Sequence, residues 1–314
     1  MQAPVFYGID VAKDELVIAA EDGRCYSIAN RPKAIGRWLL QLEPAAAIGM
    51  ESTGGYHRTL LALCSRAGHT AYLLDPHQVH AYRRALGFRG KTDRLDANTL
   101  CAFLKERHAR LFAHCEPSRE LRHLQRLLRR RASVVRHRQA LRAALADCPQ
   151  CRETIRASLR ALDELIKQLE RTAVAYLQAC RRRAAHFAHL DSIDGVGTLT
   201  AAALVVALER IDYRNSDAFV AALGLDPRPY DSGQMRGVRH LSKRGDPELR
   251  RLLYCAAMAA RRRAAFGPLY ERWRAAGKSA TTALLMLARK LARIAFALHR
   301  SNTSFNPAAV SAMA

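Results

Sequence analysis

The 314-residue sequence lacks the features that mark several large classes of protein. Residues 281–300 are mainly apolar, but Arg289, Lys290 and Arg293 interrupt them, and no apolar run approaches the length that crosses a bilayer. The N-terminus leads directly into an alternating strand pattern, unlike a signal peptide. Neither a Walker motif nor a dinucleotide fingerprint is present, which argues against nucleotide-powered chemistry. We therefore expect a cytosolic protein.

Paired cysteines are also scarce. The eight cysteines are scattered, and only Cys148 and Cys151 form a CxxC pair. A structural zinc site needs a second pair of ligands nearby, and none follows. Reduced thiols in a cytosolic protein are the expected state. His57, His77 and His80 cluster in sequence without a nearby cysteine ligand, so we interpret them as surface or sheet-edge residues.

Negative charge is in short supply relative to positive charge. The sequence has 51 Lys and Arg against 28 Asp and Glu, which gives a formal net charge of +23. Most of the basic residues are Arg, whose planar guanidinium matches the geometry of a phosphate. An excess of this size favours a nucleic-acid partner.

Strand and helix patterns alternate over residues 1–115. The expected strands are residues 5–13, 15–21, 24–30, 46–52 and 70–76, and the expected helices are residues 32–42 and 56–68. Three hairpin-connected strands followed by βαβ units give a mixed sheet with flanking helices. This is the order of an RNase H/RuvC-like α/β domain, although other α/β folds share it.

Residues 116–188 change to a long, very basic helical pattern. A break at Pro149 separates two long helices, which predicts an antiparallel helical hairpin. The second helix carries a heptad seam typical of a coiled coil, formed by Ile155, Leu159, Leu162, Ile166, Leu169, Ala173, Tyr176 and Cys180. The seam is compatible with packing within one chain and with association of protomers into a dimer or tetramer.

Residues 189–314 are expected to form an all-helical domain. Asp246 followed by Pro247 is a strong helix start. The segment "IDGVGTLTAAAL", residues 193–204, fits a helix-hairpin-helix pattern. In that pattern Gly195, Gly197 and Thr198 would bring backbone amides close to a phosphate. The alternative is an ordinary glycine turn between packed helices.

Four carboxylates are candidates for a metal site. Asp10 and Glu51 each end an apolar strand pattern, and neighbouring parallel strands would bring both to the same sheet edge. Asp93 and Asp96 lie three residues apart at a helix start, so they share one helix face. Such anions repel unless a divalent cation neutralises them, and oxygen-only ligands favour Mg²⁺ or Mn²⁺. Turn, cap and macrodipole roles are the alternatives.

Ser242 lies between basic residues in "HLSKRGD". Beside Lys243 and Arg244 its hydroxyl could attack a phosphate, although a hydrogen-bonded loop serine is the commoner case. The basic positions predicted to contact nucleic acid are Lys91, Arg94, Arg236, Arg239, Lys243 and Arg244.

Motifs along the whole chain carry a family resemblance: "YGIDVAKDE", "MESTGGYHRTL", "DPHQVHAY", "KTDRLDA", "GVGTLTAAAL" and "HLSKRGDPELRRLL". Together they resemble the DEDD recombinases of the insertion-sequence one-ten group and the related Piv-type DNA invertases. The resemblance implies a transposase in which Asp10, Glu51, Asp93 and Asp96 form a RuvC-like metal-binding tetrad. It also implies that Ser242 attacks DNA to form a phosphoserine link, and that a structured RNA guides the choice of donor and target DNA.

Two competing hypotheses stay open. A RuvC-like metal-dependent nuclease would cut DNA by water attack and would not need Ser242. A basic helical nucleic-acid binder would use the acidic residues structurally and would not need the four carboxylates.

Overall fold

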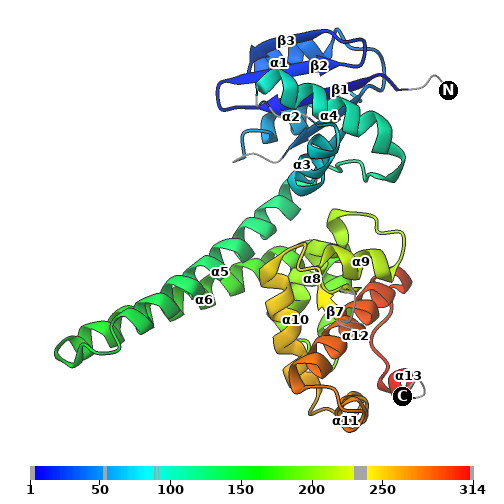
Figure 1. The fold of residues 1–314 in the computed structure, drawn as a ribbon. Helices are drawn as coiled ribbons and strands as arrows, with labels where there is room; N and C mark the ends of the chain where they lie inside the picture. Colours follow the sequence, from blue (N-terminus) through cyan, green and yellow to red (C-terminus); the bar gives the residue numbers. More distant parts are fainter. Residues whose placement is uncertain (1–3, 52–54, 88–89, 91, 230–238, 312–314) are drawn as a thin grey trace. The chain divides into compact units, whose positions relative to one another are not determined.

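The computed structural model describes residues 4–51, 55–87, 90, 92–229 and 239–311. They form two compact units, residues 1–116 and 117–314 (Figure 1). Among the described residues, no helix is long and apolar enough to cross a membrane. All eight cysteines are free thiols, as expected.

The first unit is built on a five-stranded mixed sheet with the order β3-β2-β1-β4-β5. Its strands are β1 (Phe6–Val11), β2 (Glu15–Ala20), β3 (Cys25–Ala29), β4 (Ala47–Glu51) and β5 (Thr70–Leu74). The first three strands pair antiparallel, whereas β1, β4 and β5 run parallel to one another. The mixed sheet predicted from the sequence is thereby confirmed.

Helices cover both faces of this sheet. On one face, Trp38 of α1 (Pro32–Leu39) and Leu60 of α2 (Arg58–Arg66) are buried in a core that includes Ile9 and Ile48 of the sheet. On the other face, α4 (Asp93–Arg107) buries its own apolar side. The helix α3 (Pro76–Ala85) packs against α4. The central strand β1 is therefore covered on both sides, which explains why it is almost fully buried.

A glycine in β1 sets how closely α4 approaches the sheet. A Cβ added to Gly8 would lie 2.7 Å from Cys101 Cα of α4 and closer still to that residue's backbone nitrogen. Only a residue without a side chain fits between the strand and the helix at this point. The contact brings the backbone of α4 directly against β1 at Gly8.

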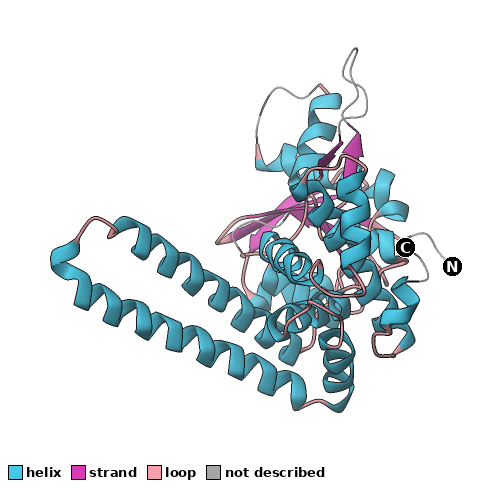
Figure 2. Cartoon of the chain, turned by 90° about the horizontal axis from the view of Figure 1, so that it is seen from below, coloured by secondary structure: helices cyan, strands magenta, loops and turns pink. Residues whose placement is uncertain are grey.

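In the second unit, α5 (Arg119–Ala144) and α6 (Arg152–Gln178) lie side by side and are joined by a short connection (Figures 1 and 2). Arg131 Nε pairs with Glu170 Oε1 at 2.8 Å, and Arg138 Nε pairs with Asp163 Oδ1 at 2.6 Å. From the first ion pair to the second, the residue number rises in α5 and falls in α6, so the two helices run antiparallel.

The seam of α6 departs from the heptad pattern at its C-terminal end. Ile166 and Ala173 are buried as the pattern predicts, but the next buried position is Leu177, while Tyr176 is 40% exposed. An α-helix has 3.6 residues per turn, so the buried stripe drifts from a strict seven-residue repeat unless the helix supercoils. Tyr176 instead stacks on His123 of α5.

The remainder of the second unit is helical except for one ribbon. Its helices are α7 (Arg181–Asp191), α8 (Thr198–Arg210), α9 (Ser216–Ala222), α10 (Pro247–Ala260), α11 (Gly267–Ala275), α12 (Ala280–Ser301) and α13 (Pro307–Ser311). The all-helical prediction is wrong for β6 (Pro227–Pro229) and β7 (Arg239–Leu241), which pair antiparallel. Two prolines in β6 disfavour helix, because proline lacks an N–H and restricts the residue before it.

One apolar core joins these helices. It contains Leu204 of α8, Phe219 of α9, Leu253 of α10 and Leu287 of α12, all fully buried. The N-terminal part of α5 contributes Leu121, Leu124 and Leu127 to the same core, and the C-terminal part of α6 contributes Ala173 and Leu177. The core thus holds one end of each long helix in place. It also holds α10, and with it the loop that precedes α10.

Candidate active site

Asp10 and Glu51 come together through strand pairing. The register of the parallel strands pairs Ile9 of β1 with Met50 of β4, and Asp10 and Glu51 are the next residues along each strand. Both side chains are half-buried. Neighbouring positions on parallel strands project from the same face of the sheet, so the carboxylates lie at one edge, as the sequence predicted.

The first turn of α4 supplies the other two carboxylates. Thr92 caps this helix, with its side chain accepting a hydrogen bond from Leu95 N at 3.2 Å. Asp93 and Asp96 follow within the first turn and lie on neighbouring positions of one face. The close packing of α4 on Gly8 fixes the height of this turn relative to β1.

All four carboxylates line one cavity of about 510 Å³. Asp10, Glu51, Asp93 and Asp96 reach it from β1, β4 and α4. Within it, Arg83 of α3 forms an ion pair with Asp96, and both side chains are largely buried. The cavity thus gathers four carboxylates, and the guanidinium of Arg83 offsets part of their negative charge.

Among the α3 residues that line this cavity, three have basic side chains, and they were not predicted as part of a site. They are His77, His80 and Arg83, which recur every three residues and share a helix face. The two histidines are exposed, in agreement with the surface position expected for them, but they also face the acidic site. The signal in the sequence was the Asp75-Pro76 helix start, since Asp75 caps α3 by accepting from His77 N at 3.0 Å.

Ser242 lies directly after β7, in the second unit. Its hydroxyl donates a hydrogen bond to Asp226 Oδ1, and its Oγ accepts one from Arg244 N at 3.4 Å. The next residue, Lys243, has a φ of 54°, a left-handed conformation that is uncommon for a residue with a side chain. Such conformations cluster at functional sites, because the surrounding structure must hold them in place.

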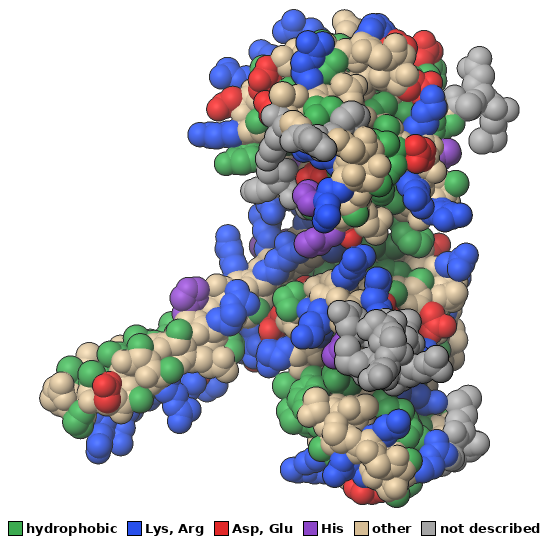
Figure 3. Space-filling model, viewed as in Figure 1, with side chains coloured by type: hydrophobic (Ala, Val, Ile, Leu, Met, Phe, Trp, Pro, Cys, Tyr) green, Lys and Arg blue, Asp and Glu red, His purple; other side chains and the backbone are tan. Residues whose placement is uncertain are grey.

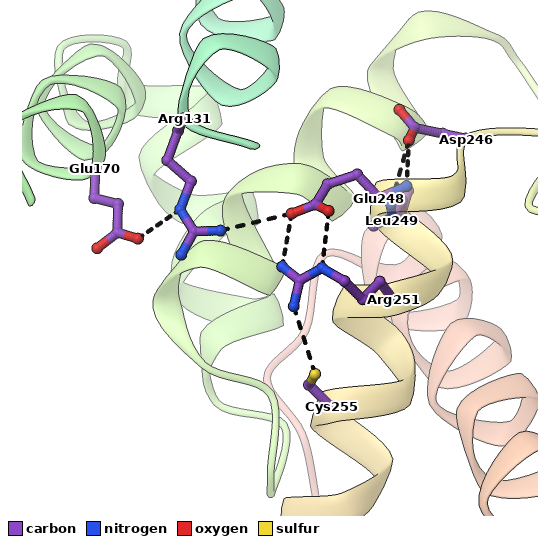
Figure 4. A network of polar contacts seen from close by, with 7 residues as sticks. All are labelled: Arg131, Glu170, Asp246, Glu248, Leu249, Arg251 and Cys255. Atoms are coloured by element: carbon purple, nitrogen blue, oxygen red, sulfur yellow. Dashed lines mark hydrogen bonds and ion pairs between the residues drawn. The ribbon is translucent and has the colours of Figure 1, made fainter. Parts of the chain in front are cut away.

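A polar network anchors the helix that follows this loop (Figure 4). Asp246 caps α10 by accepting from Glu248 N at 2.8 Å, which confirms the predicted helix start. Glu248 pairs with Arg251 at 2.7 Å and, more distantly, with Arg131 of α5 at 3.5 Å. Since Arg131 also binds Glu170 of α6, ion pairs link α10 to both long helices.

The predicted nucleic-acid contacts have different surroundings. Gly195, with a φ of 87°, faces the protein itself, since an added Cβ would lie 2.6 Å from Ala260 Cα of α10. Gly197 and Thr198 are exposed at the N-terminus of α8. Arg94, Arg239, Lys243 and Arg244 are also exposed, whereas Lys91 and Arg236 lie outside the described residues.

Two family models match the chain. A DEDD-type transposase model of IS110 elements matches residues 7–148, which include the four carboxylates. A second model, described as the transposase IS116/IS110/IS902 family, matches residues 188–274, which include Ser242. The chain belongs to this transposase family.

Relatives of nearly full length support the assignment. A Pseudomonas aeruginosa protein named "Probable family 20 transposase" is 27% identical and covers 96% of this chain and 98% of its own length. The pilin gene-inverting protein of Moraxella bovis is 25% identical, covering 96% and 97%. The transposase for insertion sequence element IS1328 of Yersinia enterocolitica is 28% identical, covering 84% and 86%. The family resemblance inferred from the motifs is thus confirmed.

This transposase is an enzyme that catalyses DNA strand transfer, so DNA is its partner. Its DEDD domain indicates a divalent metal ion. The carboxylates lining the cavity fit such an ion, since all are hard oxygen donors. Among the described residues, no three potential ligands already stand in a metal-binding arrangement.

Proposed function

We propose that this transposase is a site-specific recombinase that cuts and rejoins DNA through a covalent link between Ser242 and a DNA phosphate. Asp10, Glu51, Asp93 and Asp96 would hold Mg²⁺ or Mn²⁺. A bound divalent ion supplies charge stabilisation to the phosphodiester and to the leaving oxygen. The observation that carries the proposal is the convergence of these carboxylates on one cavity. The family match to the segment containing Ser242 supports the role of the hydroxyl.

The covalent link separates this proposal from a RuvC-like nuclease. In the proposed mechanism Ser242→Ala abolishes strand exchange and the protein–DNA adduct, which is detected as a shifted band after denaturing electrophoresis of labelled DNA. A nuclease that uses water would still cut. Ser232, which lies outside the described residues, is the matched comparison, because it is another serine of the same basic segment. Loss of the adduct in Ser232→Ala but not in Ser242→Ala would refute the assignment.

The carboxylates test the proposal against a purely structural binder. Asp10→Asn and Asp93→Asn keep the size of each side chain but remove its charge, so we expect both to lose cleavage while they retain DNA binding. Cleavage should also disappear when divalent ions are chelated, and return when Mg²⁺ or Mn²⁺ is added. Full strand exchange by Asp10→Asn would contradict the metal-site proposal.

A structured guide RNA is the further partner in this proposal. The exposed arginines of α5 support it, because they present positive charge to solvent along the length of the helix: Arg119, Arg122, Arg126, Arg129, Arg130, Arg136 and Arg142. Figure 3 shows Lys and Arg side chains along the paired helices. Glu120 at the first turn is the one acidic residue within α5, so little in the helix offsets this charge.

Sequencing of nucleic acid that copurifies with the protein tests the RNA partner. We expect one defined RNA encoded beside the gene. Changing Arg126 and Arg130 together to Gln should lower the amount retained, and should flatten the dependence of binding on salt because phosphate contacts are lost. The matched control changes Arg262 and Arg272, two exposed arginines elsewhere in the same unit, to Gln. Equal loss in both variants would point to nonspecific charge, and absence of a defined RNA would refute the guide.

Homo-oligomerisation through α6 is the remaining part of the proposal. Two large apolar side chains of this helix are left exposed: Tyr176 of the seam at 40%, and Leu165, beside the seam residue Ile166, at 42%. Analytical ultracentrifugation of Leu165→Glu should show dissociation relative to the wild type, whereas an unchanged mass would favour packing within one chain. The division into residues 1–115, 116–188 and 189–314 stays a prediction that limited proteolysis can test.

A further inference from the structure

Ser242 has a carboxylate partner that the family motifs did not indicate. Its hydroxyl hydrogen points to Asp226 Oδ1, a residue 16 positions earlier in the chain. We propose that Asp226 is the general base that takes the proton of Ser242 when its Oγ attacks phosphorus. This inference rests on the proposed serine mechanism and assigns a catalytic role to a residue outside the acidic cavity.

Backbone hydrogen bonds hold the two residues in register. Ser242 N donates to Asp226 O at 3.0 Å, and Lys243 N donates to Gly224 O at 3.2 Å. The pair is therefore joined by the main chain as well as by the side chains. A side-chain contact between two residues that already share a backbone bond has little freedom to separate, which is the preorganisation that proton transfer requires.

Two glycines let the two loops cross at this point. Gly224 has a φ of 68°, and a Cβ added there would lie 2.6 Å from Arg244 O. Gly245 has a φ of 134°, and its added Cβ would meet the backbone of Ala222. Each glycine both adopts a conformation that other residues avoid and leaves room for the opposite loop. The crossing fixes the distance between the loop of Asp226 and the loop of Ser242.

Arg250 of α10 ties the same two loops together. Its Nη1 donates to Leu223 O at 3.1 Å and to Gly245 O at 3.0 Å. One guanidinium nitrogen thus bridges the segment that precedes Asp226 and the segment that follows Ser242. The geometry is that of a clamp, and α10 is itself held by the network around Glu248.

A DNA phosphate can reach the pair from solvent. Ser242 is half-buried, and the Asp226 side chain is 25% exposed. Arg228 Nε lies 3.4 Å from Asp226 Oδ2, and its own side chain is 55% exposed. Together with the exposed Lys243 and Arg244, this guanidinium offers positive charge to an incoming phosphate. The carboxylate itself would repel DNA, so these cations are needed beside it.

The protons and the electrons balance among the chain, its DNA and the solvent. As the bond from Ser242 Oγ to phosphorus forms, the hydroxyl proton passes to Asp226 Oδ1. The bond from phosphorus to the leaving deoxyribose oxygen breaks with its electron pair, and that oxygen takes a proton from solvent. During rejoining, a DNA hydroxyl attacks the phosphoserine and releases its proton to solvent, and Asp226 returns its proton to Oγ. The same carboxylate serves as base and then as acid.

The substitution Asp226→Asn tests the role directly. The amide oxygen of Asn still accepts a hydrogen bond from the serine hydroxyl, so the loop keeps its contact, but the amide does not take up the proton. We expect the rate of adduct formation to fall by about 10²–10⁴-fold, the usual contribution of a general base, while DNA binding stays within a few-fold. The measurement uses the full-length protein with its copurifying nucleic acid and a labelled duplex spanning the end of its element.

Controls make each outcome decisive. Asp212→Asn removes an exposed carboxylate that pairs with Arg300 in the same unit, and should leave the rate unchanged. Ser242→Ala sets the floor. If Ser242→Ala abolishes the adduct but Asp226→Asn retains the wild-type rate, Asp226 only holds the loop and the inference is refuted. If Ser242→Ala still forms the adduct, the proposed nucleophile is wrong, and the inference is overturned along with the function on which it rests.

Discussion

The contact between Gly8 and α4 offers a quantitative test of how the acidic site is built. In Gly8→Ala the new Cβ would lie 2.7 Å from Cys101 Cα, whereas ordinary carbon contacts begin near 3.4 Å. The helix must therefore move away by roughly 0.7 Å or more, since the atoms that the new Cβ meets belong to the backbone of α4 and cannot rotate aside. Overpacking of this kind costs about 1–3 kcal/mol of the free energy of unfolding, occasionally more.

The same shift should harm catalysis more than stability. Asp93 and Asp96 lie on the first turn of α4, so they move with the helix relative to Asp10. A displacement of about 1 Å in a catalytic group can cost about 10²-fold in rate. We expect Gly8→Ala to remain folded at low temperature, but to cleave DNA about 10²-fold more slowly and to bind Mn²⁺ more weakly.

Two other glycines provide graded controls. At Gly49 the added Cβ would meet the side chains of Leu74 and Leu104 at 3.1 and 3.2 Å, and side chains can yield, so the cost should be smaller. At Gly36 in α1 nothing lies within 4 Å, so Ala should stabilise the helix by about 0.5–1 kcal/mol. Urea unfolding followed by circular dichroism gives the order. If Gly8→Ala were as stable as Gly36→Ala and cleaved DNA at the wild-type rate, the reasoning would be refuted.

The remaining predictions concern single side chains. Arg83→Met should tighten Mn²⁺ binding in calorimetry, because the ion no longer competes with a guanidinium for Asp96; unchanged or weaker affinity would contradict this. Burial and the neighbouring His186 lower the pKa of His299 below 6.5, so the unfolded chain binds the proton first as the pH falls. The free energy of unfolding should therefore decrease below about pH 6.5, and a His299→Leu variant should show a smaller decrease over that range. Asp246→Ala removes the cap of α10 and should lower the free energy of unfolding, measured in urea, by about 0.5–2 kcal/mol. An unchanged free energy of unfolding would contradict the role of the cap.

Local patterns in the sequence were sufficient to predict much of the first unit. Alternating apolar residues that end in Asp10 and Glu51 predicted parallel neighbouring strands, and the pairing of β1 with β4 confirmed them. The helix start at Asp246 was equally local, since a cap depends on only three or four consecutive residues. The family motifs identified the chain as a transposase because several different motifs occur along it in the order typical of the family.

Tertiary structure decided which distant residues meet. The stripe of α3 faces the acidic cavity, a placement that depends on how α3 packs against α4. The buried stripe of α6 ends at Leu177 instead of Tyr176, because the helix follows its own 3.6-residue period against the core. Asp226 meets Ser242 only because a strand pairing and two glycines bring their loops together. Periodicity assigns a residue to a face of its own element, whereas the path of the chain between elements determines what that face contacts.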